Sequence, residues 1–247
     1  MDSISQKHIE NSKFQITLIL LLCVVTFFFA IFAMGWGSSN NLDLLTTMRI
    51  IFGFESGDQL QSDIIWQLRF PRILMAIVGG AALATAGALM QGCLGNPLVS
   101  PLTLGVASGA ALGAAFAIVL GFSIVSNSDL AIVANAFLFS LVVVAIIIQL
   151  GNLRSITAES YILVGIAITF IAGAIVSTMQ YFATDAQLSQ LAHWSFGSLS
   201  RPTLENALWV SVVVIGLMPS ALKWAWDLNT LSLGGDDFAI STGVDPA

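Results

Sequence analysis

Few residues of this sequence have side chains that could do chemistry. Only 9% of the 247 residues are charged, and His193 has no partner at the spacing of a metal site. The sequence lacks the pattern Gly-x-x-x-x-Gly-Lys-Ser/Thr, so the chain does not bind ATP by that route. We therefore expect no catalytic residue, no metal ligand and no cofactor, in a protein that is not itself an enzyme.

Two polar pairs stand out beside long apolar stretches. Arg69 and Arg72 lie at the start of such a stretch, where their stems could cover apolar surface while their charges reach water. Asn96 and Pro97 could form an ordinary turn. They could equally border a polar pathway, because irregular backbone at membrane depth is tolerated only inside protein or beside water.

The apolar stretch that contains Asn96 indicates a membrane protein. From Ile73 to Ser128 the chain has no Asp, Glu, Lys or Arg. One helix of that length would reach roughly 84 Å, whereas the hydrocarbon core of a bilayer is about 30 Å thick. The stretch must fold back on itself, and the cluster of turn residues from Gly92 to Pro97, closed by Pro101, is the expected reversal point.

Composition supports the same class. The chain is 57% hydrophobic and its mean hydropathy is +0.91, values that suit helices whose backbone amides bond within their own segment. The eight basic residues form no basic stripe, so nucleic-acid binding has no support. Cys23 and Cys93 lie in or beside apolar segments and are interpreted as small hydrophobic residues. We expect the first apolar helix to be retained and not cleaved as a signal peptide.

Charge-free intervals predict an all-α fold, a polytopic helix bundle with six transmembrane helices. The predicted spans are residues 14–34, 73–91, 102–121, 130–150, 161–182 and 207–222. Small residues are frequent in the second and third spans, which indicates either a tightly packed bundle core or helices that line a translocation path. The mixed segment 227–247 cannot span.

The expected orientation has the N-terminus in the cytoplasm, because Lys7 and Lys13 precede the first span. Residues 38–63 and 183–205 are then periplasmic, and residues 151–159 are cytoplasmic.

Several stretches in order closely resemble the FecCD family, the permease subunits of ATP-binding-cassette (ABC) importers for ferric siderophores, haem and vitamin B12. The matching stretches are 67–72 (QLRFPR), 79–91 (GGAALATAGALMQ), 95–110 (GNPLVSPLTLGVASGA), 194–199 (WSFGSL) and 231–244 (LSLGGDDFAISTGV). The resemblance implies ten helices per subunit, so residues 1–247 are expected to form one permease domain that lacks the C-terminal helices.

The resemblance also implies a function and partners. We expect a multi-pass permease subunit in the bacterial cytoplasmic (inner) membrane that imports an iron–siderophore complex, powered by ATP hydrolysis on separate cytoplasmic subunits. Its other partners would be membrane lipid, a second permease subunit and a periplasmic or lipid-anchored substrate-binding protein. The alternatives are a permease for vitamin B12 or haem, a truncated remnant that does not transport, and an ion-coupled secondary transporter.

Specific residues acquire roles through the resemblance. Arg69 and Arg72 would dock the binding protein, and Asn96 and Pro97 would border the translocation pathway. A short cytoplasmic coupling helix would receive the ATPase through Leu231, Leu233, Gly234, Gly235, Asp236, Asp237, Phe238 and Gly243. The sequence itself suits a turn at Gly234–Gly235, a helix that begins at the two aspartates, and a helix end at Gly243.

Overall fold

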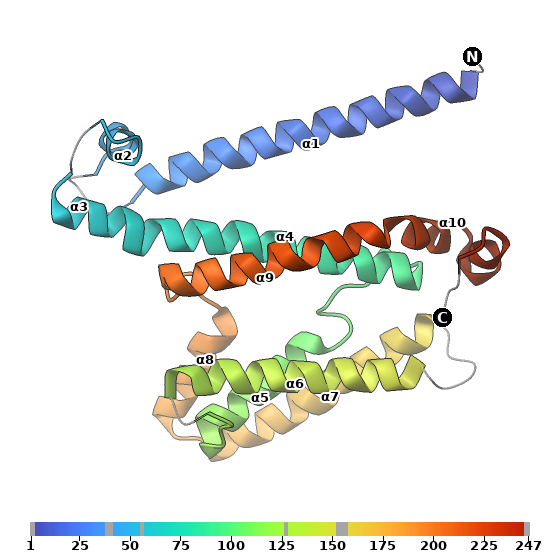
Figure 1. The fold of residues 1–247 in the computed structure, drawn as a ribbon. Coiled ribbons are helices and arrows are strands. Elements are labelled where there is room, and N and C mark those ends of the chain that lie inside the picture. Colours follow the sequence, from blue (N-terminus) through green and yellow to red (C-terminus); the bar gives the residue numbers. More distant parts are fainter. Residues whose placement is uncertain (1–2, 38–41, 55–56, 126–127, 152–157, 245–247) are drawn as a thin grey trace. The chain divides into compact units, whose positions relative to one another are not determined.

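The computed structural model describes residues 3–37, 42–54, 57–125, 128–151 and 158–244, and the regular structure in these ranges is helical (Figure 1). The elements are α1 (Ser3–Gly35), α2 (Leu44–Ile51), α3 (Gln59–Asp63), the π-helix η1 (Ile64–Arg69), α4 (Phe70–Leu94), α5 (Val106–Leu120), α6 (Ser128–Gly151), α7 (Ala158–Phe182), α8 (Asp185–Phe196), α9 (Leu204–Lys223) and α10 (Ala225–Ser241). The predicted all-α class is confirmed.

Each of the six predicted spans corresponds to an apolar helix. Five helical segments are long and apolar enough to cross a membrane: Glu10–Gly35, Gln59–Leu94, Leu130–Leu150, Glu159–Phe182 and Leu204–Lys223. The sixth apolar helix, Val106–Leu120, is shorter than these. At 15 residues it reaches only about 22 Å, less than the thickness of a bilayer core.

The helix in the third predicted span, 102–121, begins at Val106. Residues 101–105 form turns, and Gly105, directly before α5, has a left-handed φ of 78°. A left-handed residue cannot continue a right-handed helix, and apolar side chains on both sides of it hide the break from hydropathy.

The chain divides into two compact units. The first comprises residues 1–78 and 199–212, and the second comprises residues 79–198 and 213–247. In the first unit the end of α1 packs on α2 and η1. Its core consists of Met34, Leu42 and Ile65, with Ile50 and Phe70 packed against them.

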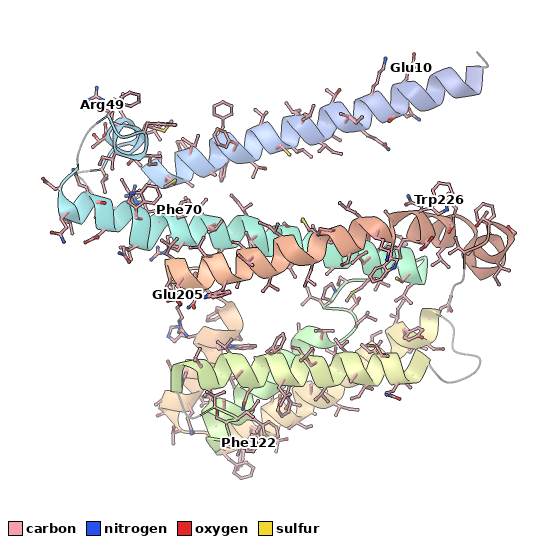
Figure 2. All side chains as sticks on the ribbon, in the orientation of Figure 1. Glu10, Arg49, Phe70, Phe122, Glu205 and Trp226 are labelled. Carbon is pink, nitrogen blue, oxygen red and sulfur yellow. The ribbon has the colours of Figure 1, made fainter. Side chains whose placement is uncertain are left out.

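Most of α1 has no packing partner in the part of the chain that the structure describes. Its apolar side chains are exposed on all sides, and Figure 2 shows them standing out along its length. Burial in lipid would remove this surface from water, because lipid tails accept such side chains.

Helix α5 is the centre of the second unit and packs against α6, α7 and α8. Its glycines allow close approach: a Cβ on Gly109 would lie 2.6 Å from Val143 Cγ2, and one on Gly113 would lie 2.7 Å from the carbonyl carbon of Asn135. Small residues at such interfaces let backbones pack tightly without a hydrophobic drive. In this helix the small residues therefore serve packing.

The proline at position 71, just after η1, explains why η1 is a π-helix. Pro71 has no backbone N–H and its ring would crowd the carbonyl four residues earlier in a regular helix. The turn before it is widened, and the Phe70 amide bonds to the carbonyl of Ile65, five residues back. This widening lets the helix continue through the proline.

Three described helices in the polar segments, α2, α3 and α8, escaped prediction, although each carries a capping signal. The Asp58 amide donates a hydrogen bond to Gln61 Oε1 at 3.1 Å in the capping box of α3. Asp43 begins α2 by accepting a hydrogen bond from the Thr46 amide at 3.0 Å. Thr184 and Gln187 form a capping box at the start of α8. Hydropathy finds only spans, so short helices between them need these local signals.

Candidate functional site

The arginine pair lies at the junction of η1 and α4, in the first unit. Arg69 is the last residue of η1 and is partly buried, whereas Arg72 is in the first turn of α4 and is exposed. Arg69 donates a hydrogen bond from Nη1 to the main-chain carbonyl of Met34, near the end of α1. The two side chains predicted to act together therefore have different surroundings.

The turn at Asn96 begins where α4 ends. Gly95 has a φ of 56°, its amide bonds to the carbonyl of Gly92 at 3.4 Å, and the Asn96 amide bonds to the carbonyl of Gln91 at 3.2 Å. This pair of bonds is the Schellman arrangement that closes a helix with a left-handed glycine. The Asn96 side chain then accepts from the Leu98 amide at 2.9 Å, which shapes the next turn.

The rest of this loop satisfies many of its own polar groups. Ser100 and Thr103 exchange hydrogen bonds between side chain and backbone in both directions, and Gln91 donates from its amide to the carbonyl of Val99 at 3.3 Å. The loop also lies close to α7, since a Cβ on Gly165 would lie 2.6 Å from the carbonyl oxygen of Thr103. Such internal bonding is what irregular backbone needs to lie at membrane depth.

The segment expected to contact an ATPase is α10, and it is broken in the middle. Gly235 has φ 69° and ψ −164°, a conformation open almost only to glycine, so two helical pieces meet there. The backbones of Asp236 and Asp237 are helical directly after this break, in agreement with the sequence prediction. The ring of Phe238 lies against Gly234, and 42% of its surface remains exposed.

The end of α10 matches the sequence prediction at Gly243. This glycine has a φ of 83°, its amide bonds to the carbonyl of Ile240 at 3.1 Å, and the Val244 amide bonds to that of Ala239 at 2.9 Å. The same Schellman arrangement therefore closes α10 and α4. Ala239 and Val244 are buried, although sequence reasoning selected neither.

An open cavity of about 690 Å³ brings the Asn96 turn together with α10 inside the second unit. Its described lining contains no charged side chain. The residues are Ala84, Thr85, Ala88, Leu89, Gln91 and Gly92 of α4, Gly95, Asn96 and Pro97 of the turn, and Ala221, Leu222, Ala225, Leu228, Asn229 and Ser232 of α9 and α10. α4 and α10 approach each other closely at Gly92, because a Cβ there would lie 3.3 Å from Leu228 Cβ.

Asn96 also lines a second cavity of about 330 Å³, which Leu98, Leu102, Thr103, Ile162, Ile166 and Thr169 complete. The structure thus brings Asn96 and Pro97 to the first half of α10. Neither lining contains Leu231, Leu233 or the residues from Gly234 to Gly243. The arginine pair belongs to the other unit. Sequence reasoning missed Leu228 and Asn229, which have no signal except their place one helical turn before Leu231 and Ser232.

Asp43, at the start of α2, has a shifted pKa. Hydrogen bonds from the side chain and the backbone amide of Thr46 lower the pKa of Asp43 below its usual range. The carboxylate therefore stays ionised as the cap of α2, where negative charge also suits the helix dipole.

Comparison with known proteins gives consistent matches. The model of the FecCD transport family matches residues 18–247. MJ0087, a candidate ABC transporter permease protein of Methanocaldococcus jannaschii, is 35% identical over 255 residues, covering 98% of this chain and 70% of its own length. The hemin transport system permease protein HmuU of Yersinia pestis is 35% identical over 203 residues, covering 81% of this chain and 60% of its own length.

A solved structure is also similar. It is an inward-facing conformation of a candidate metal-chelate type ABC transporter, with a TM-score of 0.74 and 28% identity over 92% of this chain and 68% of that one. The present chain therefore spans 60–70% of the length of these three proteins.

Proposed function

Since this chain belongs to the FecCD transport family, we propose that it is a membrane-spanning permease subunit of an ABC importer for metal chelates. ATP would be hydrolysed on separate cytoplasmic subunits. The permease would work with a second permease subunit and a substrate-binding protein, in a cytoplasmic (inner) membrane.

The observation that carries this proposal is the cavity shared by the Asn96 turn and α10. An importer needs a mechanical connection between the surface that meets the ATPase and the backbone that borders the pathway. Leu228 of α10 lies against Gly92, directly before the Asn96 turn, which supports a connection of this kind. In this proposal a push on α10 reaches the turn through that contact.

The periplasmic and cytoplasmic sides of the membrane hold different partners in this proposal. Arg69 and Arg72 face the periplasm in this proposal, where positive charge can bind carboxylates of the binding protein and fix its register. In this proposal the coupling residues face the cytosol with α10: Leu231, Leu233, Gly234, Gly235, Asp236, Asp237, Phe238 and Gly243. Residues 1–247 act as one permease domain. The lack of charge in the described cavity lining suits passage of a large ligand that must not bind tightly.

A ferric siderophore is the proposed cargo. The names of HmuU, a hemin permease, and of the metal-chelate transporter both describe iron or metal bound in an organic ligand. Haem and vitamin B12 are the alternatives in the same chemical class. The ion-coupled alternative is weaker, because the six predicted spans carry no Asp, Glu, Lys or Arg that could exchange protons.

Uptake measurements in cells test the energy source. Accumulation of a radiolabelled ferric siderophore should collapse with vanadate and survive a protonophore while ATP is maintained. A permease-deletion strain is the control for background uptake. Loss of accumulation with the protonophore alone would favour the ion-coupled alternative, and uptake of cobalamin or haem in place of the siderophore would reassign the cargo.

A further inference from the structure

The carbonyl of Val99 lies at the buried end of the turn that follows α4. Val99 is 1% exposed, and the backbone around it is not helical. A buried carbonyl needs a donor from within the protein, because water does not reach it. Gln91, in the last turn of α4, donates a hydrogen bond from Nε2 to this carbonyl at 3.3 Å. The side chain therefore reaches across the turn to its far end.

Gln91 also holds the near end of the same turn, through its backbone. Its carbonyl accepts a hydrogen bond from the Asn96 amide at 3.2 Å. Within the turn, the Leu98 amide donates to Asn96 Oδ1 at 2.9 Å, and the Val99 amide donates to the Asn96 carbonyl at 3.3 Å. The internal bonds fix the shape of the turn, whereas the two bonds to Gln91 fix its position on α4.

The residues after Val99 have hydrogen bonds of their own. The Ser100 amide donates to Thr103 Oγ1 at 2.8 Å, and the Leu104 amide donates to the Ser100 carbonyl at 3.2 Å. Neither bond involves Gln91. The influence of its side chain should therefore end at Val99.

Gln91 lies beside the contact between α4 and α10. It lines the cavity of about 690 Å³, and its neighbour Gly92 lies against Leu228 of α10. The described lining of this cavity carries no charge, so a lysine or arginine donor there would lack an ionic partner. A glutamine supplies the donor without that cost.

We propose that Gln91 is a positioning residue whose side-chain amide holds the Asn96 turn on the end of α4, so that a movement of α10 at Gly92 carries the turn with it. The hold on the turn concerns the chain itself, whereas the transfer of movement rests on the proposed function. Without the side-chain amide, the turn would keep its internal bonds but would be attached to α4 at its near end alone.

The test compares two variants with wild type, each purified with its partner subunits in lipid nanodiscs. Gln91→Met removes the donor and retains a similar length without adding charge. Gln15→Met is the matched control, because it makes the same chemical change at an exposed position of α1.

Amide exchange reads the hold on the turn without any transport. Gln91→Met should speed exchange of the Leu98 and Val99 amides by about fivefold, as expected for the loss of one hydrogen bond. Exchange at Leu104 should stay at the wild-type rate, and Gln15→Met should match wild type throughout. Equal protection of the turn in wild type and Gln91→Met would overturn the inference. Faster exchange along the whole of α4 would make Gln91 a residue of helix stability and would also overturn it.

Uptake of a ferric siderophore at increasing concentrations of loaded binding protein tests the transfer of movement. Gln91→Met should lower the maximal uptake rate by about fivefold and leave the half-saturating concentration unchanged, because the residue acts after docking. Gln15→Met should leave both values at wild type. An unchanged maximal rate in Gln91→Met would refute the transfer and leave the exchange result standing. A wild-type complex that imports no ferric siderophore, haem or cobalamin would refute the proposed function itself.

Discussion

Gly113 and Gly79 are both glycines of apolar helices, but their surroundings differ. A Cβ on Gly113 would meet the backbone of Asn135 on α6 and would lie 2.9 Å from Phe139 Cβ, whereas no described atom lies within 4 Å of a Cβ on Gly79. Gly80 and Gly87 of α4 are as open as Gly79. The sequence shows the same enrichment in both helices, and only the contacts separate a packing glycine from a free one.

Substitution by alanine should therefore have opposite effects at the two sites. Gly113→Ala should lower the free energy of unfolding by about 1–3 kcal/mol, because the obstructing atom is backbone and cannot move aside. Gly79→Ala should be neutral or should stabilise by up to about 1 kcal/mol through helix propensity. Unfolding of each purified variant in a denaturing detergent titration measures both, and equal stability of the two variants would contradict the α5–α6 packing.

At the scale of elements, the break in α10 at Gly235 can be tested directly by substitution. Gly235 holds a backbone conformation that costs an alanine of order 1–3 kcal/mol, so Gly235→Ala should straighten or shift the second piece of α10. We expect the variant to insert normally and to lose most of its stimulation of the partner ATPase. ATP hydrolysis by the reconstituted complex is the measurement.

Gly216→Ala in α9 is the matched control, since no described atom lies within 4 Å of its added Cβ. Its ATPase stimulation should stay near that of wild type. Full stimulation by Gly235→Ala would show that the break is not needed for coupling.

For the whole molecule, the decisive property is orientation. Phe54 is 82% exposed and Leu233 is 77% exposed, so a cysteine at either position would be accessible. With Cys23 and Cys93 changed to serine, Phe54→Cys should react with a membrane-impermeant maleimide in intact spheroplasts. Leu233→Cys should react only after lysis, because the proposed orientation puts α10 in the cytosol.

Spheroplasts kept sealed and then lysed provide the internal control for both positions. Labelling of Leu233→Cys before lysis, with Phe54→Cys protected, would invert the orientation and remove α10 from the reach of an ATPase.

The fold class and several local structures follow from the amino-acid sequence alone. Apolar length and the absence of charge require helices in lipid, because backbone groups there must bond within their own segment. The breaks at Gly235 and Gly243 were predictable from residue type, since left-handed backbone strongly favours glycine. The resemblance of ordered motifs identified the family over most of the chain.

The contacts of those residues become visible only once the helices are packed. Packing separated Arg69 from Arg72 through a carbonyl 35 positions away, and it brought Asn96 to Leu228 and Asn229 around one cavity. It also shortened the third apolar helix at Gly105, which fits against Gly165 of α7. Local sequence cannot predict such pairings, because each depends on which distant backbone reaches the residue once the helices have packed.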